Sequence, residues 1–396
     1  MTNRVRLREI AEVFNGKTPS KLEQRDRGHP VLKIRDIDEY GRHRGITESF
    51  IDPALAAKYS SKWVRRGDTL ILNAAHNADY VASKSFFAGP EADGSLATGE
   101  WLLVRPRVEL THPAFVNYWL RSAGTRDAIR FLVKGIHLYP KDVAELELSL
   151  PSIEEQRSIA DLLARAEGIL RLRREAQQKA DGLIPAFFVE LFGDPIVNPM
   201  GWPISDLGSV LQNGPNNGLY KHKSAYGSGT PILRIDAFYD GAVRDLSALK
   251  RLRLDSEDEL RRFALTPGDI VINRVNSPEY LGKSAIIPRL AEPTVFESNM
   301  MRFAVDTQRV LPEFVIALLQ HSASRRHFHA NAKHAINQSS INQQDVKSLR
   351  VTTPPLDLQH EFKRRVAAAE SIASQQASAL VTARATFDAL LSRTFA

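Results

Sequence analysis

The sequence has 396 residues, of which 43% are hydrophobic and 25% are charged. This composition is typical of soluble globular proteins, argues against extensive disorder, and leaves room for two or more domains. Because cysteine is absent, disulfides, cysteine-ligated zinc, iron–sulfur clusters and a cysteine nucleophile are excluded. No apolar run reaches the ~20 residues that span a bilayer, and the N-terminus lacks the apolar stretch of a secretory signal. We therefore expect a cytoplasmic protein that does not insert into a membrane.

The formal net charge is +7 and the sequence pI is about 9.5. A basic balance favours an anionic partner, with nucleic acid ahead of a membrane surface. A basic protein without any polyanionic partner is the alternative that composition leaves open.

The first 150 residues alternate short apolar runs with turn-rich polar loops. The pattern predicts a short helix over residues 7–14, a basic loop over 15–21 and a strand over 29–35. Within residues 63–73 it predicts a turn at Gly67-Asp68 followed by a buried strand. A strand over 101–104, a helix over 113–120 and a last strand over 146–150 follow.

A long helical pattern follows over residues 151–194, with apolar side chains recurring at spacings of three and four. Ser152 followed by Glu155 predicts a capped start, and Gly193 followed by a proline predicts the end. About 40 residues at ~1.5 Å rise would span ~60 Å, which is too long for a core helix of one small domain. Gly182 and Pro185 predict a kink or a break near the C-terminal end of the pattern.

A second copy of this helix lies at residues 354–396. Gln156 and Gln359, each in a Pro-x4-Gln pattern, are 203 residues apart, and so are Phe192 and Phe395. Further matched segments lie in the same order in both halves at offsets of 199 to 203 residues: 29–34 with 230–235, 67–71 with 268–272, 113–116 with 312–315, and 142–143 with 345–346. Matches in one order at nearly one offset indicate a tandem duplication.

The predicted fold class is α/β (α+β), with two mixed globular domains in tandem and two long helices. We place a first recognition domain at 1–150, a long spacer helix at 151–194, a second recognition domain at 195–353, and a second spacer helix at 354–396. The halves share mainly apolar and turn positions, whereas their polar loops differ. One fold kept twice with two different surfaces is the simplest interpretation.

These features together resemble the specificity subunit of type I restriction–modification systems over essentially the whole chain. The resemblance rests on the tandem repeat, the helix starts LPSIEEQRSIADLL and PPLDLQHEFKRRV, the opening LREIAEVFNGKTPSK, the strands GDTLI and GDIVI, and the segment ELFGD. It implies that each globular domain reads one half of a bipartite site on double-stranded DNA, and that the two helices pack antiparallel as a coiled-coil spacer. It also implies that the helices bind two methyltransferase subunits and, through them, restriction/motor subunits, and that S-adenosylmethionine, ATP and Mg²⁺ are used by those partners.

Catalytic motifs are absent from the sequence itself. Gly282-Lys283-Ser284 ends like a phosphate-binding loop, but Ser277 stands where the first glycine belongs. Neither a Gly-x-Gly-x-x-Gly loop nor the Asn/Asp-Pro-Pro-aromatic sequence of adenine methyltransferases occurs. A cluster of four histidines at 321–334 has no acidic residue within it and has cationic neighbours, so we expect no metal there. The sequence thus predicts no catalytic residue, no cofactor and no metal in this chain.

Candidate DNA-binding residues lie in polar loops, since Arg and Lys suit guanine and phosphate while Asn and Gln suit adenine. For any single residue, a solvated loop or a turn-forming role is an equally good interpretation. The first domain supplies Lys17, Ser20, Lys21, Arg35, Asn73, His76, Asn77, Lys84, Lys134, His137 and Lys141. The second supplies Asn216, Asn217, Tyr220, Lys221, Arg234, Asn273, Arg274, Asn276, Lys283, Lys333, Asn337 and Gln338. The segment 273–276 is the strongest group, because residues 73–77 occupy the same place in the first half with different chemistry.

The apolar stripes of the two helices are the candidate partner-binding surface, although a dimerisation arm would show the same stripes. The residues proposed for partner contact are Ile159, Leu163, Ile169, Leu183, Phe187, Phe362, Val366, Ile372, Leu380 and Phe387. We expect a non-catalytic DNA-recognition subunit. Its rivals are a stand-alone DNA-binding regulator with two recognition domains and a cryptic nuclease or methyltransferase.

Overall fold

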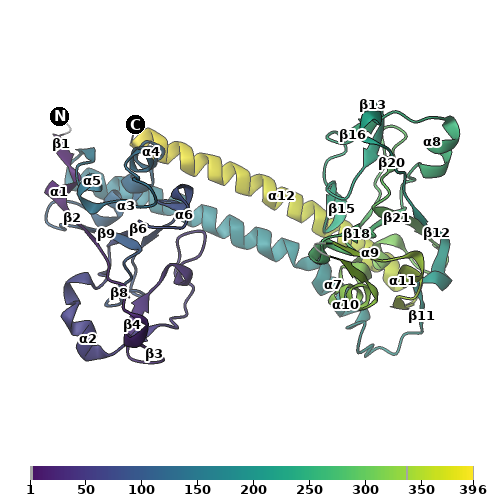
Figure 1. Cartoon of the computed structure of the whole chain (residues 1–396), viewed down its shortest axis with the longest axis horizontal. Coiled ribbons are helices and arrows are strands. Elements are labelled where there is room, and N and C mark those ends of the chain that lie inside the picture. The colour runs from purple at the N-terminus through teal and green to yellow at the C-terminus, as the bar shows by residue number, and fades with distance from the viewer. Residues whose placement is uncertain (1–2, 336–337, 396) are drawn as a thin grey trace. The chain divides into compact units, whose positions relative to one another are not determined.

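The computed structural model describes residues 3–335 and 338–395. The chain forms two compact units, an N-terminal unit of Met1–Glu175 with Ser378–Ala396, and a C-terminal unit of Ala176–Ala377. The boundaries that the sequence predicts at 150, 194 and 353 follow secondary structure, whereas the compact units divide within the long helices (Figure 1).

The N-terminal unit is built on an antiparallel sheet with the order β2-β9-β6-β7. Its strands are β2 (Ala11–Asn15), β9 (Trp101–Pro106), β6 (Thr69–Leu72) and β7 (Ser85–Phe87). Ile71 packs into a core on one face of the sheet, and Leu70 packs into another core on the other face. Burial on both faces explains why the sequence of β6 is apolar without alternation.

One face of this sheet is covered by short helices and a two-stranded ribbon. The elements are β1 (Asn3–Arg6), α1 (Leu7–Ile10), α3 (Pro113–Arg121), α4 (Ala123–Phe131), α5 (Pro140–Val143) and β10 (Glu147–Leu150). The predicted helix over 7–14 is wrong in its second half, because Ala11–Asn15 pairs with β9 as a strand. An apolar run this short fits either conformation, and only the long-range pairing decides between them.

A smaller lobe lies on the other face of the N-terminal sheet. It contains β3 (Gln24–Arg25), β4 (His29–Leu32), β5 (Phe50–Ile51), α2 (Pro53–Lys58) and β8 (Leu96–Ala97), and its sheet has the order β3-β5-β4-β8. Val31, Ile51, Ala56 and Leu96 form its core. The 3₁₀ turn Lys21–Glu23 leads from β2 of the main sheet into this lobe, and the turn Ile34–Asp36 lies between β4 and β5 within the lobe.

The C-terminal unit repeats this plan with a six-stranded sheet of order β12-β21-β17-β19-β15-β14. These strands are β12 (Leu211–Asn217), β21 (Met300–Val305), β17 (Ile270–Asn273), β19 (Ser284–Ile286), β15 (Gly241–Val243) and β14 (Phe238–Tyr239). Ile272 faces Met301 in this sheet as Ile71 faces Leu102 in the first. Because the first four strands follow the order of the N-terminal sheet, the predicted tandem repeat is confirmed.

The remaining elements of the C-terminal unit form two three-stranded sheets, a ribbon and covering helices. The sheets are β16-β13-β20, with β13 (Tyr226–Leu233), β16 (Lys250–Leu252) and β20 (Val295–Phe296), and β18-β23-β22, with β18 (Val275–Asn276), β22 (Lys333–Ala335) and β23 (Gln338–Ser340). The ribbon pairs β11 (Ile204–Asp206) with β24 (Arg350–Thr352), and the helices are α8 (Glu257–Phe263), α9 (Pro312–Gln320), α10 (Ser322–Asn331) and α11 (Gln343–Lys347).

The first long helix consists of α6 (Ile153–Asp181) and α7 (Leu183–Phe192), which confirms the predicted interruption at Gly182. The predicted cap is present, since the Glu155 amide donates to Ser152 Oγ (3.2 Å) and the Ser152 amide donates to the Glu155 carboxylate (3.3 Å). Gly193 ends α7 with a φ of 76°, a conformation that favours glycine.

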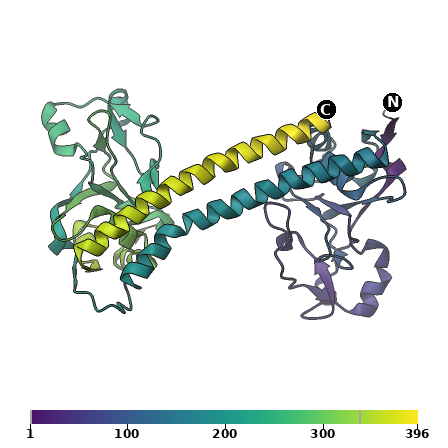
Figure 2. The ribbon, with the colours of Figure 1, turned by 180° about the vertical axis from the view of Figure 1, so that it is seen from behind.

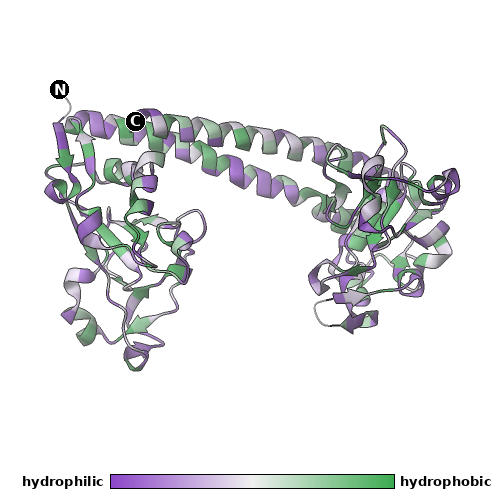
Figure 3. Cartoon of the chain, turned by 45° about the horizontal axis from the view of Figure 1, so that its top comes forward, coloured by the Kyte–Doolittle hydropathy of each residue, from purple (hydrophilic) through white to green (hydrophobic). Residues whose placement is uncertain are grey.

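The second long helix, α12 (Leu356–Thr394), begins in the C-terminal unit and ends in the N-terminal one, so it runs antiparallel to the first (Figures 1 and 2). In the N-terminal unit Leu163 shares a core with Phe387, and in the C-terminal unit Phe188 shares a core with Phe362. Figure 3 shows the alternation of hydrophobic and hydrophilic residues along both helices that this pairing requires. Among the described residues, no helix is long and apolar enough to cross a membrane.

A buried glutamine ties each long helix to the unit in which the helix begins. Gln156 Oε1 accepts hydrogen bonds from the His112 amide (2.9 Å) and the Thr111 hydroxyl (2.8 Å). Gln359 Oε1 accepts from the Leu311 amide (2.7 Å), and its Nε2 donates to the Arg309 carbonyl (3.2 Å). The repeated glutamine of the sequence is therefore a repeated packing contact.

Gln359→Leu is expected to destabilise the C-terminal unit, because the Leu311 amide and the Arg309 carbonyl would stay buried without a partner, at about 1–3 kcal/mol for each group. Urea unfolding followed by tryptophan fluorescence measures the loss. Gln375→Leu, at an exposed site on the same helix, is the control. Equal midpoints for the two variants would contradict the role of Gln359.

Candidate nucleic-acid interface

Two of the polar loops in the N-terminal unit leave the same edge of the main sheet. Strands β2 and β6, which flank β9, end at the same end of the sheet. There Asn73 Nδ2, at the end of β6, donates to Oδ1 of Asn15, the last residue of β2 (2.9 Å). The Gly16 amide donates to the Trp101 carbonyl (2.9 Å), and the Asn73 amide donates to the Glu100 carbonyl (2.8 Å). The loops 16–21 and 73–77 are thereby held next to each other.

A third loop joins this edge from far along the chain. The Leu138 amide donates to the Asn73 carbonyl (2.8 Å), and Ala74 forms a bridge with His137. The exposed residues His76 and Asn77 therefore lie in the same region as the 134–141 loop. Lys134 in this loop is partly neutralised by Asp142, at 2.6 Å.

The C-terminal unit brings its equivalent loops together in the same way. Strand β12 ends at Asn217, and the next residue, Gly218, donates from its amide to the Met300 carbonyl (3.1 Å). Strand β18 pairs with β23, so Asn276 lies opposite Ser339, and the Ile341 amide donates to the Arg274 carbonyl (2.9 Å). Residues 273–276 thus lie beside the hairpin of β22 and β23.

Each unit therefore has one edge at which three loops meet. We call these edges the N-terminal and the C-terminal reading edge. On the first, the exposed predicted residues are Lys17, Ser20, Lys21, His76, Asn77, Lys134, His137 and Lys141, and on the second they are Asn216, Asn217, Tyr220, Lys333 and Gln338. Asn337 lies outside the described residues.

Two predicted residues are buried within these edges. Asn73 is only 4% exposed, and its counterpart Asn273 is 0% exposed. The amide group of Asn273 donates to the Tyr280 carbonyl at 3.5 Å. Buried amides position the ends of β6 and β17, and their predicted contact with DNA would need the edge to open.

The neighbouring side chains of the C-terminal edge are half-buried. Arg274 Nη1 donates to the Ser298 carbonyl (3.1 Å), and Asn276 Oδ1 accepts from the Ser277 amide (2.8 Å). Their remaining polar atoms are the ones that could meet a base.

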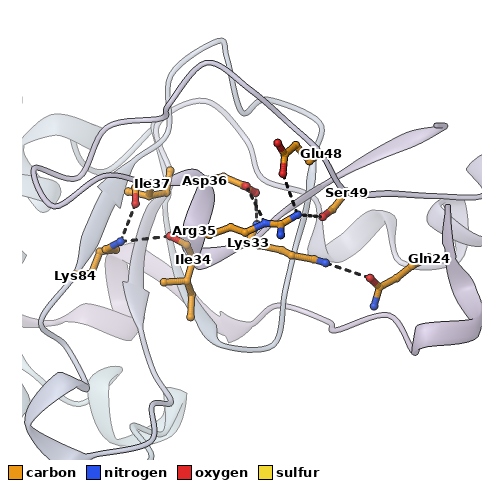
Figure 4. A network of polar contacts seen from close by, with 9 residues as sticks. All are labelled: Gln24, Lys33, Ile34, Arg35, Asp36, Ile37, Glu48, Ser49 and Lys84. Atoms are coloured by element: carbon orange, nitrogen blue, oxygen red, sulfur yellow. Dashed lines mark hydrogen bonds and ion pairs between the residues drawn. The ribbon is translucent and has the colours of Figure 1, made fainter. Parts of the chain in front are cut away.

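Lys84 and Lys283 turn inward in equivalent ways. Lys84 Nζ donates to the carbonyls of Ile37 (2.7 Å) and Ile34 (3.3 Å), as Figure 4 shows. Lys283 Nζ donates to the Ile235 carbonyl (2.6 Å) and lies 3.8 Å from the centre of the Tyr239 ring. Burial lowers the pKa of both amines. These two residues hold a turn in place, a role that the sequence did not indicate.

The arginines of these turns have acidic partners. Arg35 donates to Ser49 Oγ (3.2 Å) and lies 3.5 Å from Glu48, while its side chain stays largely exposed (Figure 4). Arg234 donates to the buried Glu297 carboxylate (3.2 Å). Lys221 is paired with Glu259 at 2.7 Å and with Asp255 at 2.5 Å. Of the cations Arg35, Arg234 and Lys221, Arg35 has the most exposed side chain and is the most accessible to a phosphate.

No group of three or more potential metal ligands occurs within residues 3–335 and 338–395. Members of the histidine cluster have other partners instead. His327 Nε2 is 2.8 Å from the Asp345 carbonyl, and His334 Nδ1 is 2.9 Å from Ser339 Oγ. The sequence alone favours DNA backbone contact or a solvated helix face for this cluster, whereas these two histidines contact the Asp345 carbonyl and Ser339.

The predicted partner-binding stripe is mostly turned toward the protein. Leu163, Phe362 and Phe387 are buried, and Ile159, Leu183, Phe187, Val366 and Leu380 are half-buried. Ile169 and Ile372 are exposed and remain available for another chain. The helical spacing in the sequence therefore found the face that packs within each unit.

Sequence reasoning missed Leu22, an aliphatic residue that is 89% exposed in the loop after β2. A leucine between Lys21 and Glu23 gives a weak sequence signal, because exposed single leucines are common.

No protein-family profile matches the chain. Among curated proteins it is similar to a specificity subunit of the putative type I restriction enzyme MjaX from Methanocaldococcus jannaschii, with 30% identity over 42% of this chain and 39% of the relative. It is similar to the StySPI specificity subunit from Salmonella potsdam, with 25% identity over 72% of this chain and 65% of the relative. The chain thus matches less than two thirds of the length of these two relatives. The EcoBI specificity subunit from Escherichia coli is 22% identical over 99% of this chain and 85% of the relative. Over most of its length the chain is thus similar to specificity subunits of type I restriction enzymes.

Two solved structures share the fold of this chain. A chain from a type I restriction–modification system superposes with a TM-score of 0.60 at 18% identity, covering 99% of this chain and 96% of that chain. The specificity subunit from M. genitalium gives a TM-score of 0.58 at 12% identity, covering 100% and 96%. This chain thus shares the fold of these two structures with few identical residues.

Lys84→Ala is expected to speed amide hydrogen exchange in the 34–37 turn, because the Ile34 and Ile37 carbonyls lose their donor. Exchange measured by mass spectrometry on the full chain tests this. Lys58→Ala, at an exposed position in α2, is the control. An unchanged exchange rate in the turn would show that the ammonium does not hold it.

Proposed function

We propose that this chain is the DNA sequence-specificity subunit of a type I restriction–modification complex. In this proposal each unit reads one half of a bipartite, asymmetric site on double-stranded DNA. The observation that supports it most directly is the pair of reading edges, which share one framework but carry different side chains. Arg, Lys, Asn and Gln on such edges suit phosphate contact and base readout.

We further propose that the long helices set the distance between the half-sites and bind two methyltransferase subunits, through which restriction/motor subunits join. Ile169 and Ile372 are exposed apolar residues that suit this contact. The chain would contribute no catalytic group, and S-adenosylmethionine, ATP and Mg²⁺ would be used by its partners.

The proposed function is tested by co-expressing the chain with the methyltransferase encoded beside it. The complex should co-elute in size exclusion and methylate DNA, and neither protein should do so alone. Methylation or cleavage by the isolated chain would contradict the non-catalytic role, and a chain that never co-elutes would favour a stand-alone regulator.

Arg274→Ala or Asn276→Ala is expected to weaken binding at one half-site only, at about 1–3 kcal/mol for each lost base contact. Binding to duplexes with either half-site altered measures the effect. Asn77→Ala, on the N-terminal reading edge, is the matched variant and should act on the other half-site. Effects of one variant on both half-sites would contradict independent reading.

Inserting four residues after Glu175 together with four after Ala377 should lengthen both helices where the compact units divide. Four helical residues add ~6 Å, which equals about two base pairs at ~3.4 Å each. The methylated motif should then keep both half-sites and gain about two base pairs between them. An unchanged gap would refute the ruler role of the helices.

A further inference from the structure

Leu22 is an aliphatic side chain presented to solvent by a rigid turn. It lies in the 3₁₀ turn Lys21–Glu23 and is 89% exposed. The Ser20 amide donates to the Glu23 carboxylate (2.7 Å) on one side of it. On the other side, Arg25 Nη1 donates to the Leu22 carbonyl (2.7 Å). The backbone of the turn is therefore held by hydrogen bonds while the Leu22 side chain lies in solvent.

The turn belongs to the N-terminal reading edge. It follows loop 16–21, in which the Lys17 amide donates to the Ala97 carbonyl (2.8 Å). Along the chain Leu22 lies among the exposed cations Lys17, Lys21, Arg25 and Arg27, which outnumber the acidic residues of the same stretch, Glu23 and Asp26. Cations at this density attract the phosphates that border a DNA groove, which would bring the leucine against the base edges.

We propose that Leu22 enters a groove of the half-site read by the N-terminal unit and makes apolar contact with a base there. This inference rests on the proposed DNA-reading function and adds a base-contacting residue to it. An apolar side chain can recognise the thymine methyl group, or can press between base pairs, and either contact depends on sequence.

The C-terminal unit provides an internal comparison. Its equivalent 3₁₀ turn, Lys223–Ala225, follows β12 as Lys21–Glu23 follows β2. Ser224 occupies the position of Leu22 and is also exposed. The two half-sites therefore meet a hydroxyl in one unit and an aliphatic group in the other.

The test uses the complex of the full chain with its methyltransferase and duplexes carrying the mapped recognition sequence or a scrambled N-terminal half-site. Leu22→Ala should weaken binding to the mapped sequence roughly tenfold, and binding to the scrambled duplex should not change. Its salt dependence should equal that of the wild type, because an apolar contact releases no counterions.

Two controls separate this contact from charge and from exposure alone. Lys21→Ala should weaken binding to both duplexes and lower the salt slope by about one. Val108→Ala removes a side chain that is 71% exposed in the turn after β9, at the opposite end of the sheet strands, and should change nothing.

Wild-type affinity of Leu22→Ala for the mapped sequence overturns the inference, and so does an equal loss on both duplexes. Loss of the methyltransferase from the complex, with DNA binding unchanged, would assign Leu22 to a protein contact and overturn it as well. If the wild-type complex binds both duplexes equally, that result contradicts the proposed DNA-reading function itself, and with it the inference about Leu22.

Discussion

The packing of the end of α12 against the N-terminal unit is the contact on which the rest of this unit depends. Phe387 and Leu391 share a core with Leu163 and Tyr118, and the Phe395 ring lies 5.3 Å from that of Phe115. Fully burying one such side chain contributes about 1.5–3 kcal/mol. Residues at the far end of the sequence therefore form part of the core of the first unit, so this unit is not built from the first half of the chain alone.

The same arrangement occurs in the C-terminal unit with residues of matching position. Phe192, the counterpart of Phe395, packs on Phe314 at 4.8 Å, and both rings share a core with Phe362. The core residues, the buried glutamines and the order of the central strands are repeated, whereas the loops at the reading edges are not. A framework held twice by the same contacts can change one set of loops without disturbing the other, which suits the two different half-sites proposed above.

The repeat, the long helices and the central strands could be predicted from the sequence because each depends on local spacing. The turn at Gly67-Asp68 before β6 and the capping box at Ser152 depend on neighbours within a few residues, and those predictions are confirmed. The matching segment before β17 forms the same turn. Lys84 and Lys283 could not be placed, since a lysine in a turn carries no sign of the carbonyls that will surround it. The contact between the loops 73–77 and 134–141 could not be predicted from the sequence either, because it depends on long-range backbone pairing.

The central claim is that two similar units with different reading edges recognise two different half-sites at a fixed distance. Genome-wide mapping of methylated adenines in cells that express this chain with its methyltransferase tests that claim most directly. The account predicts one bipartite motif with two unlike half-sites and a constant gap. A continuous motif, a palindrome with identical half-sites, or no dependence of methylation on this chain would contradict it.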